Sequence, residues 1–340
     1  MLSFENDYIE GACEEILRRL VETNYEKQPG YGQDAYSASA AEKLRAACAC
    51  PEAEVFLLTG GTQTNAVVLD ALTHSCEGVV AAETGHVSSH EAGAIEFTGH
   101  KVLTLPQHQG KLDAGELEDY VNRFYADPNH PHMVQPGAVY ISQATEYGTV
   151  YTLAELEALS AVCRARGLPL YADGARLGCA LAARGADVTL PDMARLCDAF
   201  YVGGTKNGAL CGEAVVFPHG APAHFFTTVK QHGALLAKGR LLGVQFDTLF
   251  TDGLFLRLAA HAVEMADRLE RGLREKGFAF YIETTTNQKF PVLTDGERAR
   301  LESLAAVSFW ERLPDGRSVV RLATSWATRP EDVEALIRQL

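Results

Sequence analysis

The sequence predicts an α/β fold in which helices cover a mostly parallel sheet, followed by a smaller C-terminal α+β unit. Short apolar runs with little polar alternation recur through the first 250 residues, as expected for strands that are buried on both faces. Helical patterns, with apolar residues three and four positions apart, separate several of these runs. Strands that alternate with helices favour a parallel sheet.

The expected elements follow one another along the chain. Helices at 9–23 and 38–49 precede the first strand. The expected strands are Glu54–Leu58, Val79–Ala82, Lys101–Leu105, Ala138–Ser142, Leu170–Ala172, Ala199–Val202 and Ala214–Phe217, and the helices between them lie at 62–73, 113–125 and 152–166. A long helix at 254–276, mixed short strands and a last helix at 330–339 predict the smaller unit. We therefore expect an N-terminal helical arm at 1–30, a large domain at 31–250 and a small domain at 251–340.

Composition narrows the classes of function. The 340 residues are 47% hydrophobic, enough for a large core, and carry a formal net charge of −14. Such a charge repels phosphates, so we expect neither nucleic acid nor an anionic membrane as partner. The N-terminus lacks the basic and apolar regions of a secretory signal, and no apolar run is long enough to span a membrane.

Cysteine and histidine spacing gives no metal signature. None of the eight cysteines forms a Cys-x-x-Cys motif, and the eleven histidines show no His-x-x-x-His spacing. Buried free thiols in a reducing cytosol are the simpler interpretation, so we expect a cytoplasmic protein without a bound metal.

A glycine-rich turn follows the strand at 54–58. The segment Thr59-Gly60-Gly61-Thr62 opens a helix, whose first N–H groups have no internal partner and attract anions. Gly61 and Thr62 are therefore candidate phosphate ligands, although a plain turn with Thr62 as a helix cap explains the same residues. The segment Gly30–Ala35 matches the dinucleotide fingerprint only nominally, because no strand precedes it.

Three further strand ends carry reactive side chains. Asp173 follows the strand at 170–172 and can keep a pyridine nitrogen protonated, or simply cap a helix. Lys206 lies in a glycine-rich turn after the strand at 199–202, where loss of solvent lowers the pKa of an amine and allows Schiff-base formation. His86 follows the strand at 79–82 and can stack on an aromatic cofactor. Lys230 and Lys238, the other candidate lysines, are expected on a solvent-reachable helix.

The carboxyl ends of strands meet at one edge of an open α/β sheet, where ligands bind. A phosphate site, a carboxylate and a lysine, in that order, together predict pyridoxal 5′-phosphate (PLP) held as a Schiff base on Lys206.

The combination resembles the threonine aldolase group of the β-eliminating lyase superfamily, which are fold-type I PLP enzymes with an aspartate-aminotransferase-like large domain. Five segments carry the resemblance: Gly60–Asn65, His86 with Glu91-Ala92-Gly93, Asp173–Arg176, Lys206 and Arg321–Thr324. The similarity extends over most of the chain.

The resemblance implies roles for individual residues. Asp173 would pair with the pyridinium nitrogen, and Arg176 with the ring hydroxyl and the substrate carboxylate. Arg321 would take the substrate carboxylate as a two-point fork, which a lysine cannot form. The family's active site lies between subunits, so we expect a homodimer or homotetramer in which Arg240 reaches the phosphate of a neighbouring subunit.

Several positions depart from the family pattern. Asn6 lies where a serine usually contacts the substrate, and the segment 142–146 lacks the histidine found near the substrate hydroxyl. Ser325 replaces a histidine that often follows the arginine motif.

The expected reaction is retro-aldol cleavage of a β-hydroxy-α-amino acid, L-threonine or L-allo-threonine, into glycine and an aldehyde. Lys206, His86 and Asp173 would be catalytic. The base for the β-hydroxyl proton is unassigned; His86, through a water, is the first candidate and Glu146 the second. β-Elimination or transamination of another amino acid would use the same cofactor residues and is the alternative. A PLP-binding regulator without catalysis is disfavoured, since the chain has no basic arm for nucleic acid.

Overall fold

A seven-stranded sheet forms the centre of the larger part of the molecule. The computed structural model describes residues 2–340. In spatial order the strands are β2 (Glu54–Leu58), β8 (Glu213–Phe217), β7 (Ala199–Gly203), β6 (Leu170–Asp173), β5 (Gln135–Ser142), β3 (Glu77–Ala82) and β4 (Lys101–Leu105). All seven predicted strands are confirmed, and the predicted bounds differ by three residues at most.

The sheet is parallel except for one strand. β8 is antiparallel to both β2 and β7, whereas the other neighbouring pairs are parallel. Residues 204–212 connect β7 to β8, too few for the crossover that a parallel neighbour requires. This short connection contains Lys206, so the reversal of the chain places the lysine directly at the sheet edge.

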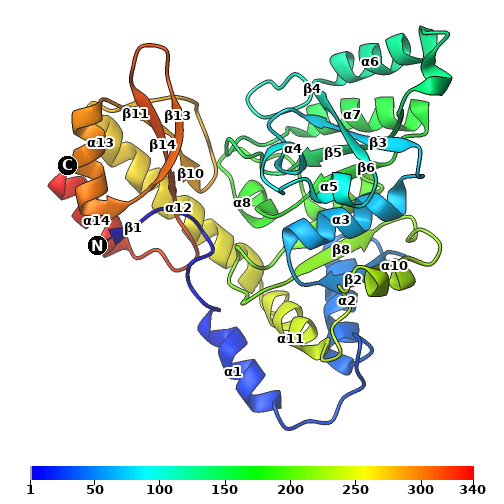
Figure 1. The fold of residues 1–340 in the computed structure, drawn as a ribbon. Coiled ribbons are helices and arrows are strands. Elements are labelled where there is room, and N and C mark those ends of the chain that lie inside the picture. The colour runs from blue at the N-terminus through cyan, green and yellow to red at the C-terminus, as the bar shows by residue number, and fades with distance from the viewer. Residues whose placement is uncertain (1) are drawn as a thin grey trace.

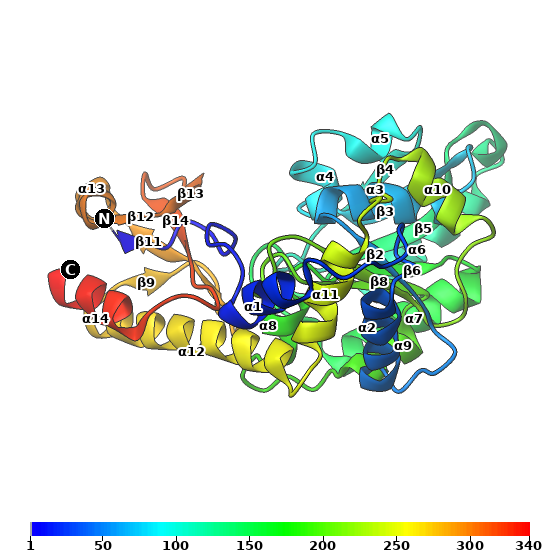
Figure 2. The same cartoon turned by 90° about the horizontal axis from the view of Figure 1, so that it is seen from below.

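Helices cover both faces of this sheet (Figures 1 and 2). The predicted helices are present as α1 (Glu14–Thr23), α2 (Ala35–Ala47), α3 (Gly61–Leu72), α6 (Ala114–Ala126), α7 (Leu153–Arg166), α12 (Leu254–Glu275) and α14 (Pro330–Gln339). Helices that periodicity did not predict are α4 (His86–Ser89), α5 (Ala94–Phe97), α8 (Leu177–Leu181), α9 (Leu190–Leu196), α10 (Phe225–Gln231), α11 (Arg240–Leu249) and α13 (Asp295–Leu304). Most of these are too short for a clear 3.6-residue pattern.

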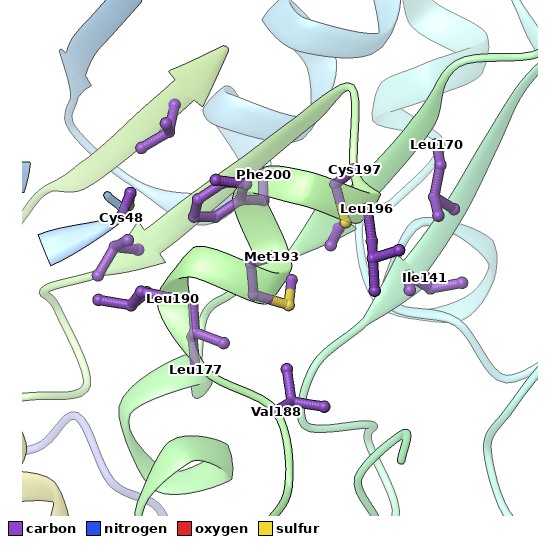
Figure 3. Close-up of a cluster of buried hydrophobic side chains, with 14 of the residues drawn as sticks. Cys48, Ile141, Leu170, Leu177, Val188, Leu190, Met193, Leu196, Cys197 and Phe200 are labelled. Carbon is purple, nitrogen blue, oxygen red and sulfur yellow. The ribbon is translucent and has the colours of Figure 1, made fainter. Parts of the chain in front are cut away.

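Two hydrophobic clusters lie on opposite faces of the sheet. Alternate residues of each strand enter different clusters, as the pleat requires: Phe200 and Val202 pack on one face, Ala199 and Tyr201 on the other. Figure 3 shows part of the first cluster, where Met193 of α9 packs against side chains of the neighbouring strands. The sheet is thus buried on both faces, which explains the unbroken apolar runs in its sequence.

The smaller part is an antiparallel sheet with three helices. β10 (Gln288–Lys289), β14 (Ser318–Ala323), β11 (Pro291–Leu293) and β9 (Ala279–Phe280) are neighbours in that order, and β13 (Ser308–Arg312) also pairs with β14. The long helix α12 contacts α8 of the larger part and α14 of the smaller part, and Figure 2 shows it running along both.

The N-terminal segment belongs to both parts. β1 (Leu2–Ser3) pairs in parallel with β12 (Ala305–Ala306) of the smaller part, whereas α1 packs against α11 of the larger part. The division at residues 30 and 250 stays a prediction. What the pairing adds is that residues 4–13 must cross from one part to the other.

The sequence predicted no apolar run long enough to span a membrane, and the lengths and apolarity of the helices bear on that expectation. In residues 2–340, no helix is both long and apolar enough to cross a bilayer.

Candidate active site

Two adjoining chambers lie at the carboxyl ends of the parallel strands. The glycine-turn chamber, of about 310 Å³, is bounded by Thr59–Thr62, Asp173 and Glu213. The aromatic chamber, of about 430 Å³, is bounded by Tyr147, Phe309, Trp310 and Arg321. Both chambers share one set of lining residues: Tyr8, His86, Glu146, Arg176 and Lys206. The chambers therefore form one site, and the structure brings together the strand-end residues that the sequence singled out.

The glycine-rich turn is placed as predicted. Gly60 precedes the first residue of α3, so the N–H groups of the first turn point out of the helix end. A Cβ at Gly61 would lie 3.1 Å from the Tyr201 hydroxyl, which leaves little room for a side chain. Among residues 2–340 the Thr62 hydroxyl makes no hydrogen bond and remains available to a ligand.

Asp173 is buried at the end of β6 and held by four donors. Its Oδ1 accepts hydrogen bonds from Tyr201 Oη (2.5 Å) and Ala175 N (2.9 Å), and its Oδ2 from Tyr140 Oη (2.8 Å) and Asn65 Nδ2 (2.9 Å). Burial alone would raise the pKa of Asp173, but the His86 charge and these hydrogen bonds outweigh it and lower the pKa. The group is therefore a fixed anion, which is what pairing with a protonated ring nitrogen requires.

His86 begins the short helix α4 and lines both chambers. Its Nδ1 lies 2.7 Å from Glu91 Oε1, and Asn65 Nδ2 donates to the same oxygen at 2.7 Å. Burial lowers the pKa of His86, but the Glu91 hydrogen bond and the charges of Asp173 and Glu91 raise it above its usual value. The imidazole is thus anchored at one nitrogen and favours its protonated form.

Lys206 lies between the two chambers. In residues 2–340 no carboxylate comes within ion-pair distance of its Nζ, which lies 5.7 Å from the ring centroid of Tyr8. Burial, followed by the Arg176 charge, lowers the pKa of Lys206. A larger neutral fraction makes the amine a better nucleophile toward an aldehyde. Of the other candidate lysines, Lys230 is on α10, but the prediction of a helix at Lys238 is wrong because this residue lies in an exposed turn.

Glu213, the first residue of β8, also lines the glycine-turn chamber. In the sheet it is paired with both Leu58 and Gly203, the residues just before the two ligand-binding turns. Its Oε1 accepts a hydrogen bond from Thr205 Oγ1 (2.8 Å), whereas its buried Oε2 has no partner among residues 2–340. Burial raises the pKa of Glu213 to about 8.

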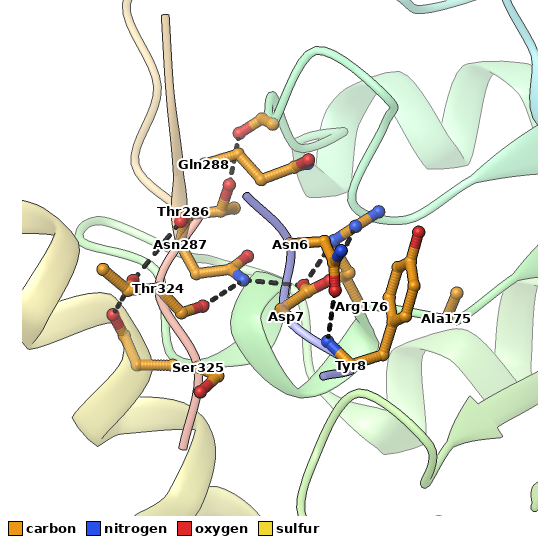
Figure 4. Close-up of polar contacts among 12 residues, drawn as sticks. Asn6, Asp7, Tyr8, Ala175, Arg176, Thr286, Asn287, Gln288, Thr324 and Ser325 are labelled. Atoms are coloured by element: carbon orange, nitrogen blue, oxygen red, sulfur yellow. Dashed lines mark hydrogen bonds and ion pairs between the residues drawn. The ribbon is translucent and has the colours of Figure 1, made fainter. Parts of the chain in front are cut away.

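Arg176 makes a two-point ion pair with Asp7 (Figure 4). Nε and Nη2 of the arginine lie 2.7 and 2.9 Å from the two carboxylate oxygens, and Asn287 Nδ2 donates to Asp7 Oδ2 at 2.8 Å. The guanidinium lines both chambers but commits these two donors to Asp7, which leaves Nη1 for a ligand.

Arg321, on β14, is held more loosely. Its contacts to Gln288 Oε1, Glu5 O and Ser308 Oγ measure 3.4, 3.2 and 3.3 Å, and its buried Nε has no partner among residues 2–340. An arginine with long contacts and an unsatisfied donor, at the wall of a chamber, is suited to a carboxylate ligand.

Two predicted residues lie outside both chamber linings. Asn6 precedes Asp7, and its Oδ1 accepts a hydrogen bond from Tyr8 N at 3.1 Å. Arg240 donates to the carbonyl oxygens of Thr23 and Glu26, at 2.5 and 2.7 Å. Neither chamber of its own chain includes Arg240, so a role for Arg240 in cofactor binding depends on a second subunit.

Sequence reasoning gave no role to several residues that build the site. They are Asp7, Tyr8, Asn65, Tyr140, Tyr201 and Glu213. Asp7 directly follows Asn6, which the family resemblance placed at a substrate-contacting position, and this was a usable signal. The tyrosines occupy apolar runs, where a buried hydroxyl cannot be distinguished from ordinary core.

The donor set fits PLP. The chamber offers free helix N–H groups and the Thr62 hydroxyl for a phosphate, a buried anion for a ring nitrogen, an anchored imidazole for a ring face, and an unpaired lysine for an aldehyde.

Comparisons with known proteins agree with this geometry. A sequence model of the β-eliminating lyase family matches residues 4–296. The low specificity L-threonine aldolase of Pseudomonas aeruginosa is 33% identical over 341 residues, covering 99% of this chain and 96% of that protein. A solved threonine aldolase from Leishmania major superposes with a TM-score of 0.96 at 42% identity, covering 99% of this chain and 98% of that one.

A more distant structure defines the fold class. A double mutant of Thermus thermophilus aspartate aminotransferase has a TM-score of 0.73 at 16% identity, covering 100% of this chain and 90% of that one. The predicted aspartate-aminotransferase-like fold is confirmed.

Proposed function

Because this chain belongs to the β-eliminating lyase family, we propose that it is a PLP-dependent lyase that cleaves L-threonine or L-allo-threonine into glycine and acetaldehyde. The observation that carries the proposal is the placement of Lys206 and Arg321 on the wall of one chamber. An α-amino acid bound there presents its amino group and its carboxylate to two groups that complement them.

The residues around the glycine-turn chamber would hold the cofactor. Gly61 and Thr62 would bind the phosphate, Asp173 the ring nitrogen and Lys206 the aldehyde, with His86 against the ring. When bound, PLP supplies an electron sink for the bonds at the substrate α-carbon. Asp173 maintains that property because its four donors hold it as an anion.

Arg321 and Arg176 would contribute differently to ligand binding. Arg321 would bind the substrate carboxylate in place of its long contacts to Gln288, Glu5 and Ser308. Arg176, already paired with Asp7, has Nη1 for the ring hydroxyl or for the same carboxylate. Fixing the carboxylate orients the α-carbon and its bond to the β-carbon, which is the bond to be broken.

The proposal includes a homo-oligomeric assembly and a cytoplasmic location. A homodimer or homotetramer with shared active sites is supported by the position of Arg240, which lies outside the linings of both chambers of its own chain. A cytoplasmic location is supported by eight cysteines that form no disulfide within the chain. Asn6 remains a proposed substrate contact through its position next to Asp7 and Tyr8.

The direct test is incubation of the purified PLP-loaded protein with L-threonine, L-allo-threonine and phenylserine, followed by assays for aldehyde and glycine. We expect stoichiometric aldehyde and glycine from at least one of them. Pyruvate or another keto acid, without glycine, would assign the protein to β-elimination or transamination instead.

A further inference from the structure

Glu146 occupies the boundary of the two chambers with one carboxylate oxygen unused. Oε1 accepts hydrogen bonds from His86 N at 3.0 Å and Ser142 Oγ at 2.6 Å. Oε2 is buried and has no partner among residues 2–340. A buried oxygen without a donor is uncommon unless a water or a ligand supplies the missing hydrogen bond.

We propose that Glu146 is the catalytic base that takes the proton from the β-hydroxyl group of the substrate. This assignment rests on the function proposed above and names the group that performs its proton transfer.

The position of the substrate hydroxyl follows from the other two anchors. With the carboxylate at Arg321 and the amino group toward Lys206, the β-carbon must face the remaining polar wall where the chambers join. Besides Lys206, the residues common to both chambers are Tyr8, His86, Glu146 and Arg176. Of these four, Glu146 and His86 are the side chains that can accept a proton.

His86, the other candidate, is poorly suited to accept this proton. Glu91 holds its Nδ1 at 2.7 Å and, with Asp173, raises the pKa of the ring. These contacts favour the protonated ring, and in that form the imidazole donates hydrogen bonds and cannot remove a proton from an alcohol. His86 is therefore better placed to stabilise the cofactor than to act as base.

The backbone holds Glu146 in a fixed place. Residues 145–149 form a closed turn in which Thr145 N donates to Thr149 O at 2.9 Å and Gly148 N to Thr145 O at 2.9 Å. The side chains of Thr145 and Thr149 lie 2.6 Å apart. A general base must stay within hydrogen-bond distance of its proton, and this turn limits how far the carboxylate moves.

The proposed step balances with the substrate, Glu146 and water, which accepts one proton and supplies one. The hydroxyl proton moves to Glu146 Oε2, the C–O bond becomes a carbonyl, and the bond between the α- and β-carbons breaks. The electron pair of that bond stays with the α-carbon, which takes up one proton to give glycine. Glu146 then returns its proton to water before the next turnover.

Burial raises the pKa of Glu146, and the charges near it have opposing effects. The titratable groups that face it are His86 from α4, Asp173, Arg176 and Lys206 from the sheet edge, and Tyr140 and Tyr147 from β5 and its turn. Cleavage by the wild type should lose rate on the acid side, where the Glu146 carboxylate becomes protonated.

The test compares PLP-loaded wild type with Glu146→Gln and Glu146→Asp. Two reactions are measured: aldehyde release from whichever β-hydroxy amino acid the wild type cleaves, and exchange of the α-proton of glycine for deuterium by NMR. Exchange needs the cofactor, Lys206 and the carboxylate site, but no β-hydroxyl chemistry. General-base catalysis contributes about 10²- to 10⁴-fold.

We expect Glu146→Gln to lower kcat for aldehyde release at least about 100-fold, keep glycine exchange within about threefold and lose the acid limb of the pH profile. Glu146→Asp should recover part of the rate. Glu96→Gln, which removes an exposed carboxylate on α5 outside the linings of both chambers, is the matched control.

Two results would overturn the assignment: cleavage by Glu146→Gln at near wild-type rate, or equal loss of cleavage and glycine exchange, which indicates a structural role. Failure of the proposed function would look different, because the wild type itself would then release no aldehyde from any β-hydroxy amino acid.

Discussion

Asp7 and Arg176 form a buried two-point ion pair that joins the N-terminal segment to the end of β6. The distances from Arg176 Nε and Nη2 to the two Asp7 oxygens are 2.7 and 2.9 Å, and Asn287 of the smaller part donates to the same carboxylate at 2.8 Å. Three distant segments of the chain, at residues 7, 176 and 287, therefore meet at one carboxyl group on the border of the active site.

Asp7→Asn should strongly destabilise the fold. The variant leaves the Arg176 charge buried and without its partner, which typically costs about 3–5 kcal/mol. Urea unfolding of the wild type and the variant measures this difference. Asp315→Asn, which breaks an exposed pair with Arg317, is the control and should change the free energy of unfolding far less than Asp7→Asn does. If Asp7→Asn and Asp315→Asn lower the unfolding free energy by the same small amount, burial does not strengthen the contribution of the Asp7–Arg176 pair.

The same pair predicts a loss of stability in acid. Burial alone would raise the pKa of Asp7, but Arg176, Lys206 and two side-chain hydrogen bonds lower it to about 2. The unfolded chain takes up this proton near pH 3.9, so the contribution, on the order of 2 kcal/mol, is complete above that pH and disappears as the pH falls through about 2. Acid unfolding curves of Asp7→Asn should lack this part of the transition.

Arg321→Lys should weaken substrate binding. A lysine keeps the positive charge but loses the planar fork that binds a carboxylate at two points. Losing one charged hydrogen bond of about 1.5–3 kcal/mol predicts a KM for the amino acid about 10- to 100-fold higher. Steady-state kinetics with L-threonine measures this change, and Arg317→Lys in the exposed hairpin should leave KM unchanged. An unaltered KM in Arg321→Lys would place the carboxylate elsewhere.

Lys206→Ala should abolish covalent attachment of the cofactor. Borohydride treatment of the PLP-loaded wild type is expected to fix the cofactor to a peptide containing Lys206, visible by mass spectrometry and by absorption. Lys206→Ala should show no such adduct, whereas Lys238→Ala, at an exposed turn, should resemble the wild type. Modification of another lysine in the wild type would refute the assignment.

Glu213→Gln should change how stability depends on pH. The folded protein holds the Glu213 proton up to about pH 8, whereas the unfolded chain releases it near pH 4.3. The proton-linked stability is therefore complete below about pH 4.3 and is lost as the pH rises through about 8. Glu213→Gln removes this loss, so the amount by which its unfolding free energy exceeds that of the wild type should grow with pH and reach its full size above about pH 8.

Urea unfolding at about pH 5.5, 7 and 8.5 measures the difference between the two proteins. The control is Glu54→Gln, which removes an exposed carboxylate from the neighbouring strand β2. If the difference in unfolding free energy between Glu213→Gln and the wild type is the same at every pH, the Glu213 carboxyl does not hold a proton in the folded state.

The sequence by itself determined the fold class, the strands and the residues at their ends. Strands buried on both faces must be apolar throughout, so all seven strands of the large sheet were visible as short hydrophobic runs. Because parallel strands end at one edge, it also followed that Gly61, His86, Asp173 and Lys206 should meet, and they do.

Only the tertiary structure decided which partners these residues have. The pairing of Asp7 with Arg176 and the loose contacts of Arg321 depend on segments far apart in the chain, as do the oxygens of Glu146 and Glu213 that have no partner within residues 2–340. Hydrogen bonding and burial depend on the three-dimensional position of each atom, which spacing along one chain does not encode. The sequence therefore identified the groups that we propose bind the cofactor, and packing showed the oxygen that we propose takes the substrate proton.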